Sequence, residues 1–489
     1  MKKFLSLVLA LVLCLSVAGI SMPATADEDP FELVILRYGD TNGQPGDPAV
    51  EEKINEWLSE NGYNFKVSIG YTTWGDPNLQ IRLAAKEHID VSWTNYSGTY
   101  KTMIDGNFFY NLIDIYKNYE GLYNSMPDYI WNTVLRKDGT ALYQIPCYKE
   151  SGSADALVVL KSVADRFGWT DIIANDPDRI WTMQELEPYM AEAYATGDYD
   201  QMIFMCGVLF SNGTNEYIGI DDYAAITSYI AIDLSGDTTK AVKLTDIPAY
   251  QDLVKTMVKY NEAGYITEGQ LTGDASRDQS WIFNVDVYTP DFQNNMDTRY
   301  STYDENGVYC MRLSESYRLN NSALGSAYSV ISYTENVDAC MQFMDALYSS
   351  TELADLWLYG IEGVNYTRLE DGSCQKIADS GFSYDTWCSV NVMTPSLQDT
   401  DSKDKKEQYA AFNDNAVDSI LLGFDFDDSA VEAECAACDA VFSEYGKALD
   451  YGFLGEEGLD EFSDALDAAG VQAVLDEVNR QLTEFFAAK

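Results

Sequence analysis

Apolar runs alternate with amphipathic helical patterns over the first hundred residues of the chain. Three runs have the length of buried strands: residues 31–38, 65–71 and 89–94. The segments between them carry apolar residues at helical spacing, and each begins with an Asp-Pro pair, at 47–48 and 76–77. This order of strand, helix, strand, helix and strand predicts a parallel sheet with helices on its faces.

The pattern further along the chain predicts a second α/β region and a helical C-terminal region. Strand-like runs follow at 157–160, 202–209, 281–287, 307–313 and 324–333. Amphipathic helices are expected at 337–348, 351–357, 459–466 and 471–485. The chain leaves the first region between 139 and 160, and a return crossing is expected near 307–313, so we expect two lobes joined by more than one crossing.

Aromatic and hydrogen-bonding residues gather where the first three strands end. Asp40 follows the first strand, Trp74 follows the second, and Trp93, Asn95 and Tyr96 lie at the end of the third. Ligands of open α/β sheets bind beyond the carboxyl ends of the strands. The apolar face of a sugar ring can stack on an indole while its hydroxyls bond to Asp and Asn. Each Trp taken alone also fits ordinary core or rim packing, but their joint placement favours a ligand site.

The composition restricts the partners and the chemistry. The 489 residues include 79 acidic and 31 basic side chains, a formal net charge of −48, which argues against nucleic acid or an anionic membrane as partner. The 35 Tyr and 9 Trp could form platforms for sugar rings or fill Tyr-rich cores. His88 is the one histidine, which excludes histidine triads and multi-histidine metal sites, and its place at a helix end favours a solvated cation.

The N-terminus has the three parts of a secretory signal peptide. Two lysines precede the apolar run 4–20, and Ala24-Thr25-Ala26 is a cleavage motif, so we expect residues 1–26 to be removed. No other run is long enough to span a bilayer. Residues 16–19 resemble the end of a lipoprotein signal, but Ile20 stands where the lipid-bearing cysteine is required. We therefore expect a secreted protein without a lipid anchor of its own.

Eight cysteines remain after cleavage, and their pairing cannot be deduced from the sequence. Cys435-Ala-Ala-Cys438 has the spacing of a redox or zinc motif. Both thiols, however, belong to one apolar helical stripe, made of Val431, Cys435, Cys438, Phe442 and Tyr445. A capping box, Ser429-x-x-Glu432, is expected to begin that helix. Buried core cysteines are the favoured interpretation, with redox or metal chemistry as the alternative.

Four stretches together resemble the extracellular solute-binding proteins of bacterial ABC importers. They are TTWGDPNLQIRLAAKEHIDVSWTN at 72–95, YQIP at 143–146, the strand and helices from LGSAYSVISY to YGIEGVNY at 324–366, and the tail from NDNAVDSILLGF at 413 onwards. The likeness is to the maltodextrin-binding-like family, and more closely to its lipoprotein-type branch in Gram-positive bacteria. The missing lipidation cysteine departs from that branch.

The resemblance implies a fold and a domain organisation. It implies an α/β, two-lobed periplasmic-binding-protein-like fold of type II, in which each lobe is a mixed sheet flanked by helices, with a helical C-terminal region. The expected divisions are a signal peptide at 1–26, lobe 1 at 27–150, lobe 2 at 151–312, a return to lobe 1 at 313–350, and completion of lobe 2 with the C-terminal helices at 351–489.

The resemblance also extends the candidate site. It implies that Tyr359-Gly360 ends a helix near the hinge, that Asp371-Gly372 forms a hairpin turn, and that Glu362, Asn365 and Tyr366 approach the cleft. Second-lobe candidates are Trp281, Tyr288 and Trp387. The full predicted ligand-binding set is Asp40, Trp74, Trp93, Asn95, Tyr96, Trp281, Tyr288, Tyr328, Glu362, Tyr366 and Trp387.

The function that follows from the resemblance is capture of a carbohydrate, in particular an oligosaccharide, and its delivery to a membrane permease. The protein is then a monomer without enzymatic activity, cofactor or metal. A secreted glycoside hydrolase is the first alternative, because the separation of two catalytic carboxyls is invisible in a sequence. A binding protein for peptide or another small solute is the second, because one fold serves many ligands.

Overall fold

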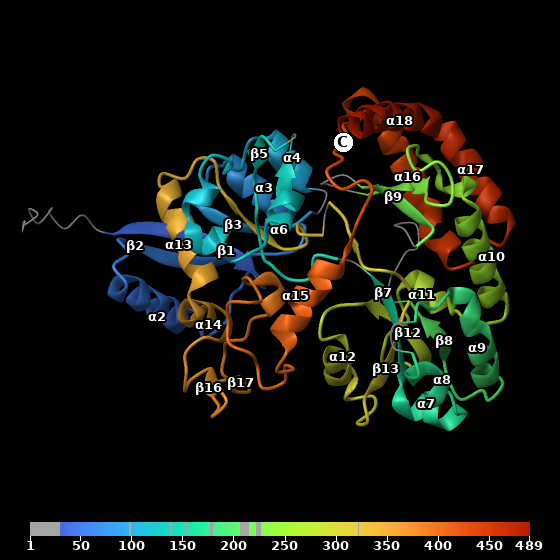
Figure 1. Ribbon diagram of the computed structural model, residues 1–489, viewed down its shortest axis with the longest axis horizontal. Helices are drawn as coiled ribbons and strands as arrows, with labels where there is room; N and C mark the ends of the chain where they lie inside the picture. Colours follow the sequence, from blue (N-terminus) through green and yellow to red (C-terminus); the bar gives the residue numbers. More distant parts are fainter. Residues whose placement is uncertain are drawn as a thin grey trace, which may run out of the picture.

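The computed structural model describes residues 30–96, 99–136, 139–152, 154–176, 179–205, 215–221, 226–320 and 322–489. The expected signal peptide and part of the strand-like run 202–209 lie outside these residues. Figure 1 shows two lobes side by side, with a helix-rich C-terminal region beside the second lobe. The two-lobed mixed α/β architecture predicted from the sequence is thus confirmed.

The first lobe is built on a five-stranded mixed sheet in the order β2-β1-β3-β15-β6. Its strands are β1 (Phe31–Tyr38), β2 (Phe65–Thr72), β3 (Val91–Thr94), β6 (Ile145–Pro146) and β15 (Ala327–Val330). The first three are parallel, as predicted, and β15 runs antiparallel to β3. Parallel pairing places the carboxyl ends of β1, β2 and β3 at one edge of the sheet.

Helices cover this sheet and complete its hydrophobic core. They are α2 (Asp47–Glu60), α3 (Pro77–Ala84), α4 (Thr99–Asp105), α5 (Glu120–Tyr123), α6 (Asp128–Val134), α13 (Val337–Ser349) and α14 (Thr351–Tyr359). Asp76 caps α3 by accepting a hydrogen bond from the Asn78 amide, as its Asp-Pro pair predicts. The helix ends at Ala84, and Ala85 is its C-cap.

One expected domain boundary differs from the structure. Residues 351–489 were expected to complete lobe 2, but the buried side chains from Leu353 to Val390 pack in the core of the first lobe. The hairpin of β16 (Tyr366–Arg368) and β17 (Cys374–Lys376) belongs to the same lobe, next to α14 (Figure 1). The reason is physical. Helix α14 buries an apolar face against the first lobe, and the sequence pattern shows which face of the helix is apolar but not which lobe it packs against.

The second lobe contains a four-stranded sheet in the order β13-β7-β12-β8. Its strands are β7 (Asp155–Leu160), β8 (Gln201–Phe204), β12 (Trp281–Val287) and β13 (Val308–Arg312). Only β8 and β12 are parallel, so this sheet is also mixed. The surrounding helices are α7 (Lys161–Phe167), α8 (Thr170–Ala174), α9 (Glu187–Tyr194), α11 (Glu268–Thr272) and α12 (Phe292–Tyr300).

Four helices, of which the last three are C-terminal, pack on a separate antiparallel sheet of β9 (Tyr217–Asp221), β10 (Ile226–Asp233) and β11 (Val242–Lys243). The helices are α10 (Pro248–Glu262), α16 (Glu432–Asp450), α17 (Glu457–Ala469) and α18 (Val471–Ala488). Gly470 separates α17 from α18 in the left-handed conformation that glycine tolerates best, as expected. We call this unit, the three-stranded sheet with its four helices, the C-terminal module.

The start of α16 confirms one expectation and corrects another. Cys435 and Cys438 are both buried in the core of the C-terminal module, as the apolar stripe predicts. The expected capping box at Ser429 is wrong, because α16 begins at Glu432 with Val431 as its N-cap. Ser429 lies in a preceding 3-10 turn, where its amide donates to the Asp427 carboxylate.

Three crossings connect the lobes. The expected divisions also imply three, but the third lies near residue 416 and not at 350/351, because residues up to Val390 pack in the first-lobe core. The first contains Gly152, the second contains Ser316 and the third contains Ala416. A Cβ atom on Gly152 would lie 2.0 Å from the Ser316 Oγ and 3.2 Å from the Ala416 Cβ, so the three segments are in close contact. The second and third also pair in parallel through β14 (Tyr317–Arg318) and β18 (Val417–Asp418).

Helix α15 (Lys405–Asn415) lies between the lobes beside these crossings (Figure 1). It contacts both sides: Asp414 accepts a hydrogen bond from Tyr129 of the first lobe, and Gln408 accepts one from the Asp291 amide of the second. The remaining short elements are β4 (Leu135–Arg136), β5 (Ala141–Leu142), and 3-10 turns at Tyr116–Asn118, Met183–Leu186 (η2), Leu244–Asp246, Thr386–Cys388 (η5) and Asp428–Ala430.

Candidate functional site

Five aromatic side chains meet at the carboxyl edge of the first sheet, and we call them the aromatic cluster: Tyr38, Trp74, Trp93, Tyr96 and Trp387. Trp74 contacts Trp93 and Tyr96, with ring centroids 6.0 and 5.5 Å apart. Tyr38 lies 4.7 Å from Trp93 and 5.2 Å from Trp387. Trp387 closes the group at 6.3 Å from Trp93. Four of the five are residues that the sequence analysis selected.

The two tryptophans at the centre of the cluster differ sharply in exposure. Trp74 is 45% exposed, whereas Trp93 is 1% exposed. The Trp93 Nε1–H donates to the Ser326 Oγ over 2.7 Å, which fixes the indole from below. An indole held open to solvent on a packed aromatic base can stack on an apolar ring face with little loss of side-chain entropy.

The polar candidates of the first lobe are placed in different ways. Asp40 is exposed just beyond β1, and its carboxylate accepts hydrogen bonds from the Asn42 amide and side chain. Asn95 is buried directly after β3. Tyr328 is fully buried opposite Trp93 in the β3–β15 pair and donates to the Ser389 carbonyl, so it supports the cluster from within the sheet.

Tyr38 completes the cluster and was not among the predicted residues. It is the last residue of β1 and lies half-buried between Trp93 and Trp387. Its position at a strand end is the same signal that selected Trp74 and Trp93. Tyr38 ends the first strand, whereas the predicted residue at this strand, Asp40, follows it.

Trp387 was expected in the second lobe, but it lies in the first. It belongs to η5, and the adjacent Cys388 is buried in the first-lobe core. The structure thereby joins it to Tyr38 and Trp93, which are more than 290 positions away in the sequence. Its misassignment has the same cause as the domain boundary described above.

Trp281 and Tyr288 lie at opposite ends of β12 in the second lobe. Trp281 is buried at the start of the strand, packs on Tyr300, and donates its Nε1–H to the Arg277 carbonyl. Tyr288 follows the end of the strand and is half-exposed, with the Arg312 guanidinium 5.1 Å from its ring centre. Tyr288 also lines a hollow of about 480 Å³ beside α15.

Glu362 and Tyr366 line a different hollow of the first lobe, next to α2 and α14, together with Trp57 and Asp355. Glu362 forms an ion pair with Arg368 at 3.4 Å. The expected helix end at Gly360 and the hairpin turn at Gly372 are both confirmed. None of the aromatic-cluster residues lines this hollow, so the structure does not join these two candidates to the cluster, and their contact with a ligand stays a prediction.

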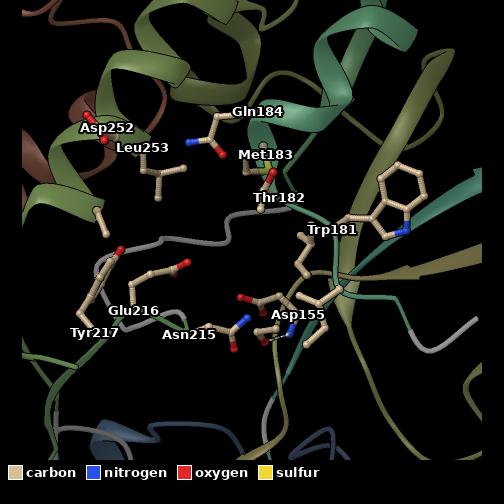
Figure 2. Close-up of a pocket in the computed structure, with 14 residues that line it drawn as sticks. Asp155, Trp181, Thr182, Met183, Gln184, Asn215, Glu216, Tyr217, Asp252 and Leu253 are labelled. Carbon is tan, nitrogen blue, oxygen red and sulfur yellow. Dashed lines mark hydrogen bonds between the residues drawn. The ribbon is translucent and has the colours of Figure 1, made fainter. Parts of the chain in front are cut away.

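A cavity of about 280 Å³ lies in the second lobe where β7, η2, β9 and α10 meet (Figure 2). Its lining is Asp155, Ile180, Trp181, Thr182, Met183, Gln184, Asn215, Glu216, Tyr217, Ala249, Asp252, Leu253, Leu313 and Ser314. The side chains of Asp155, Gln184 and Glu216 point toward the common space, whereas the Trp181 indole points away from it (Figure 2). None of these residues belongs to the predicted ligand-binding set.

Burial changes the acidity of Asp155 in this cavity. The surrounding protein excludes water and raises the pKa of its carboxyl to about 6. The Asp155 backbone is held on both sides, since its amide donates to the Ser314 Oγ and its carbonyl accepts from the Leu313 amide. No described residue forms a hydrogen bond or ion pair with its carboxylate.

Within the described residues, no group of three or more His, Cys, Asp and Glu side chains is close enough to coordinate an ion. The described helices also include none that is both long and apolar enough to cross a membrane.

Comparisons with known proteins agree with this architecture. A carbohydrate ABC transporter substrate-binding protein of Streptococcus pneumoniae is 23% identical over 511 aligned residues, 99% of this chain and 97% of the relative. An N-glycan transport solute-binding protein of Streptococcus pneumoniae, NgtS, has a crystal structure that matches 93% of this chain and 99% of its own, with a TM-score of 0.80 and 19% identity. The chain has the fold of an ABC-transporter solute-binding protein.

Two further matches bear on this fold. The alginate-binding protein AlgQ2 covers 93% of the chain with a TM-score of 0.59 and 14% identity. A domain of unknown function, DUF3502, matches residues 420–487, which contain α16, α17 and all but the last residue of α18. The resemblance inferred from the sequence is therefore confirmed, and it extends over nearly the whole chain.

Proposed function

We propose that the protein is the extracellular solute-binding component of an ABC importer and that it captures an oligosaccharide between its lobes. The observation that carries the proposal is the half-exposed Trp74 on the packed aromatic base formed by Trp93, Tyr38 and Trp387. Exposed indoles on rigid supports suit the apolar faces of sugar rings. Asp40, directly beyond β1, is placed to bond ring hydroxyls.

The similar proteins support a saccharide as the ligand. NgtS has been crystallised with Man1GlcNAc and with Man5GlcNAc, and these complexes match the chain with TM-scores of 0.72 and 0.70. The NgtS structure described without a glycan matches better, at 0.80. This difference favours an open arrangement of the lobes in the present structure, and a hinge movement upon binding.

Export and mode of action complete the proposal. The signal peptide places the mature protein, residues 27–489, on the outer face of the membrane, where the permease receives the loaded form. Release of the sugar unchanged, with no catalysis, distinguishes this function from that of a secreted glycoside hydrolase. The protein acts as a monomer, with the cleft formed by its own two lobes.

Calorimetric titration tests the proposal. Mature protein is titrated with Man5GlcNAc, with maltotetraose and with a tetrapeptide, and the recovered ligand is analysed by mass. We expect Man5GlcNAc to bind and to be recovered intact, and Trp74→Ala to weaken its affinity roughly tenfold. Tyr194→Ala is the matched control, because Tyr194 is a similarly exposed aromatic residue on α9 of the second lobe.

Each other outcome of this titration has a defined meaning. Binding of the peptide alone would discard the carbohydrate class and keep a solute-binding role. Shortened saccharides after incubation would favour the hydrolase. Equal losses for Trp74→Ala and Tyr194→Ala would show that the aromatic cluster is not the binding surface.

A further inference from the structure

The second-lobe cavity shown in Figure 2 differs in charge from an ordinary sugar pocket. Two of its side chains, Asp155 and Glu216, present carboxylates to the central space, and Asp252 adds a third at the rim, where it pairs with Lys255 at 3.5 Å. None of the fourteen described residues that line the cavity is Lys, Arg or His. A ligand in this cavity therefore meets negative charge without a neighbouring cation in the lining.

Asp155 is the residue that most clearly lacks a partner. It is partly buried at the start of β7, its backbone groups are both hydrogen-bonded, and its carboxylate has no described donor. Burial of an unpaired carboxyl is unfavourable, as the raised pKa of Asp155 shows. Such a group lowers the stability of the ligand-free protein. A ligand that supplies a cation would form a strong interaction with it.

The size and the remaining lining limit the ligand. About 280 Å³ is near the lower end of small-molecule pockets, which span roughly 300–1,000 Å³. Gln184, Asn215 and Ser314 add neutral hydrogen-bonding groups, and Leu253 and Leu313 add apolar surface. This mixture suits one polyhydroxylated ring that carries a positive charge, and it disfavours a carboxylated or sulfated ring.

We propose that this cavity binds a sugar residue bearing a free ammonium group, and that the Asp155 carboxylate receives that ammonium. The proposal rests on the proposed carbohydrate function and adds a charge preference to it: an amino sugar is favoured over its N-acetylated form, and acidic saccharides are rejected. The aromatic cluster of the first lobe stacks on neutral rings, whereas the second lobe selects by charge.

A matched pair of saccharides tests the proposal. Chitobiose, made of two glucosamine units, and N,N′-diacetylchitobiose differ only in free or acetylated amines. Calorimetric titration of the mature protein at pH 7 should show tighter binding of chitobiose by roughly tenfold or more, the effect of a charge-assisted hydrogen bond. In Asp155→Asn the two affinities should become nearly equal.

Asp171→Asn is the charge-matched control. Asp171 lies exposed on α8 of the same lobe and does not line the cavity, so this variant should keep the wild-type preference. A wild-type ratio of one or less would overturn the proposal without any variant, and so would an unchanged ratio in Asp155→Asn. Parallel titration with Man5GlcNAc separates the two proposals. If Man5GlcNAc binds but chitobiose binds no more tightly than N,N′-diacetylchitobiose, this inference alone fails. If the wild-type protein binds none of the saccharides, the proposed function fails as well.

Discussion

The side chain of Asn413 holds the backbone of Ser151, because its Oδ1 accepts a hydrogen bond from the Ser151 amide over 2.7 Å. The Asn413 Nδ2–H donates to the Lys149 carbonyl over 2.8 Å, so one buried amide binds two residues of the first crossing. Its backbone carbonyl accepts a hydrogen bond from Arg318 of the second crossing. Asn413 itself lies near the end of α15, which leads directly into the third crossing. A single residue thus links all three segments that join the lobes.

Asn413→Leu should destabilise the protein by about 2–5 kcal/mol. The leucine has a similar size but leaves the buried Ser151 amide and Lys149 carbonyl without partners, and each unsatisfied group costs roughly 1–3 kcal/mol. Urea denaturation followed by circular dichroism measures the change. Asn415→Leu is the control, because Asn415 is exposed on the same helix and its replacement should change stability by less than about 0.5 kcal/mol. Equal midpoints for the two variants would contradict the linking role of Asn413.

Gly152→Ala should impair both the fold and the hinge. The new Cβ would lie 2.0 Å from the Ser316 Oγ and close to Ala416, so the three crossings must move apart. Overpacking of this kind costs roughly 1–3 kcal/mol. We expect a lower unfolding midpoint and a weaker affinity for the saccharide, since closure requires these segments to move together.

Gly236→Ala provides the comparison for this hinge variant. Gly236 lies in an exposed turn after β10, and its nearest neighbour is the flexible Asp233 carboxylate at 3.3 Å. Its replacement should leave both midpoint and affinity close to wild type. If Gly152→Ala had the same unfolding midpoint and the same saccharide affinity as Gly236→Ala, the crossings would be less tightly packed than the structure indicates.

Trp93→Phe should weaken ligand binding indirectly, although Trp93 itself does not contact the ligand. The variant loses the hydrogen bond to Ser326 and part of the base on which Trp74 rests. We expect a loss of about 1–3 kcal/mol in stability and a severalfold weaker saccharide affinity, measured by denaturation and calorimetry.

Trp169→Phe separates the two effects of that change. Trp169 is also buried and also donates its Nε1–H, here to Glu192 of the second lobe, so its replacement should lower stability by a comparable amount. Saccharide affinity should stay unchanged. An equal loss of affinity in both variants would mean that general destabilisation, and not support of Trp74, explains the result.

The local pattern of apolar and polar residues was sufficient to predict most elements of secondary structure. The run 281–287 coincides with β12 and the run 31–38 with β1, because apolar strands are bounded by polar residues that the sequence displays directly. The parallel order of the first three strands followed from the helices between them. Such features depend on neighbours in the sequence, which the pattern records.

Features that depend on distant partners were not predictable. The pattern of 351–357 predicts a helix but not the lobe against which it packs, and Trp387 was misplaced for this reason. Arg37 shows the same limit. It sits fully buried in β1, with its guanidinium 3.5 Å from the Tyr384 ring centre and bonded to the Trp357 carbonyl. Nothing near Arg37 in the sequence identifies these aromatic partners.

The cavity of the second lobe was missed for a related reason. Its lining comes from five separated segments, and the unpaired state of Asp155 is a property of the folded chain. In the sequence, Asp155 is one acidic residue among 79 Asp and Glu. Its chemical distinction arises only from burial.

Asp155→Asn should stabilise the protein at neutral pH. The pKa of the Asp155 carboxyl is raised from 3.8 to about 6 in the folded state, so the unfolded chain releases the proton at lower pH than the folded chain does. Below pH 3.8 both states are protonated and the residue costs nothing. The cost grows as pH rises from about 4 to 6, then stays constant, and a shift of this size corresponds to about 1–3 kcal/mol.

Thermal or urea unfolding of wild type and Asp155→Asn between pH 4 and pH 8 checks this expectation. The stability difference should be small at pH 4, increase up to about pH 6, and level off above it. Asp171→Asn, which removes an exposed carboxylate, should show no such increase. A difference that stays constant from pH 4 to pH 8 would show that the Asp155 carboxyl titrates normally, and it would remove the energetic reason for a cationic ligand at that position.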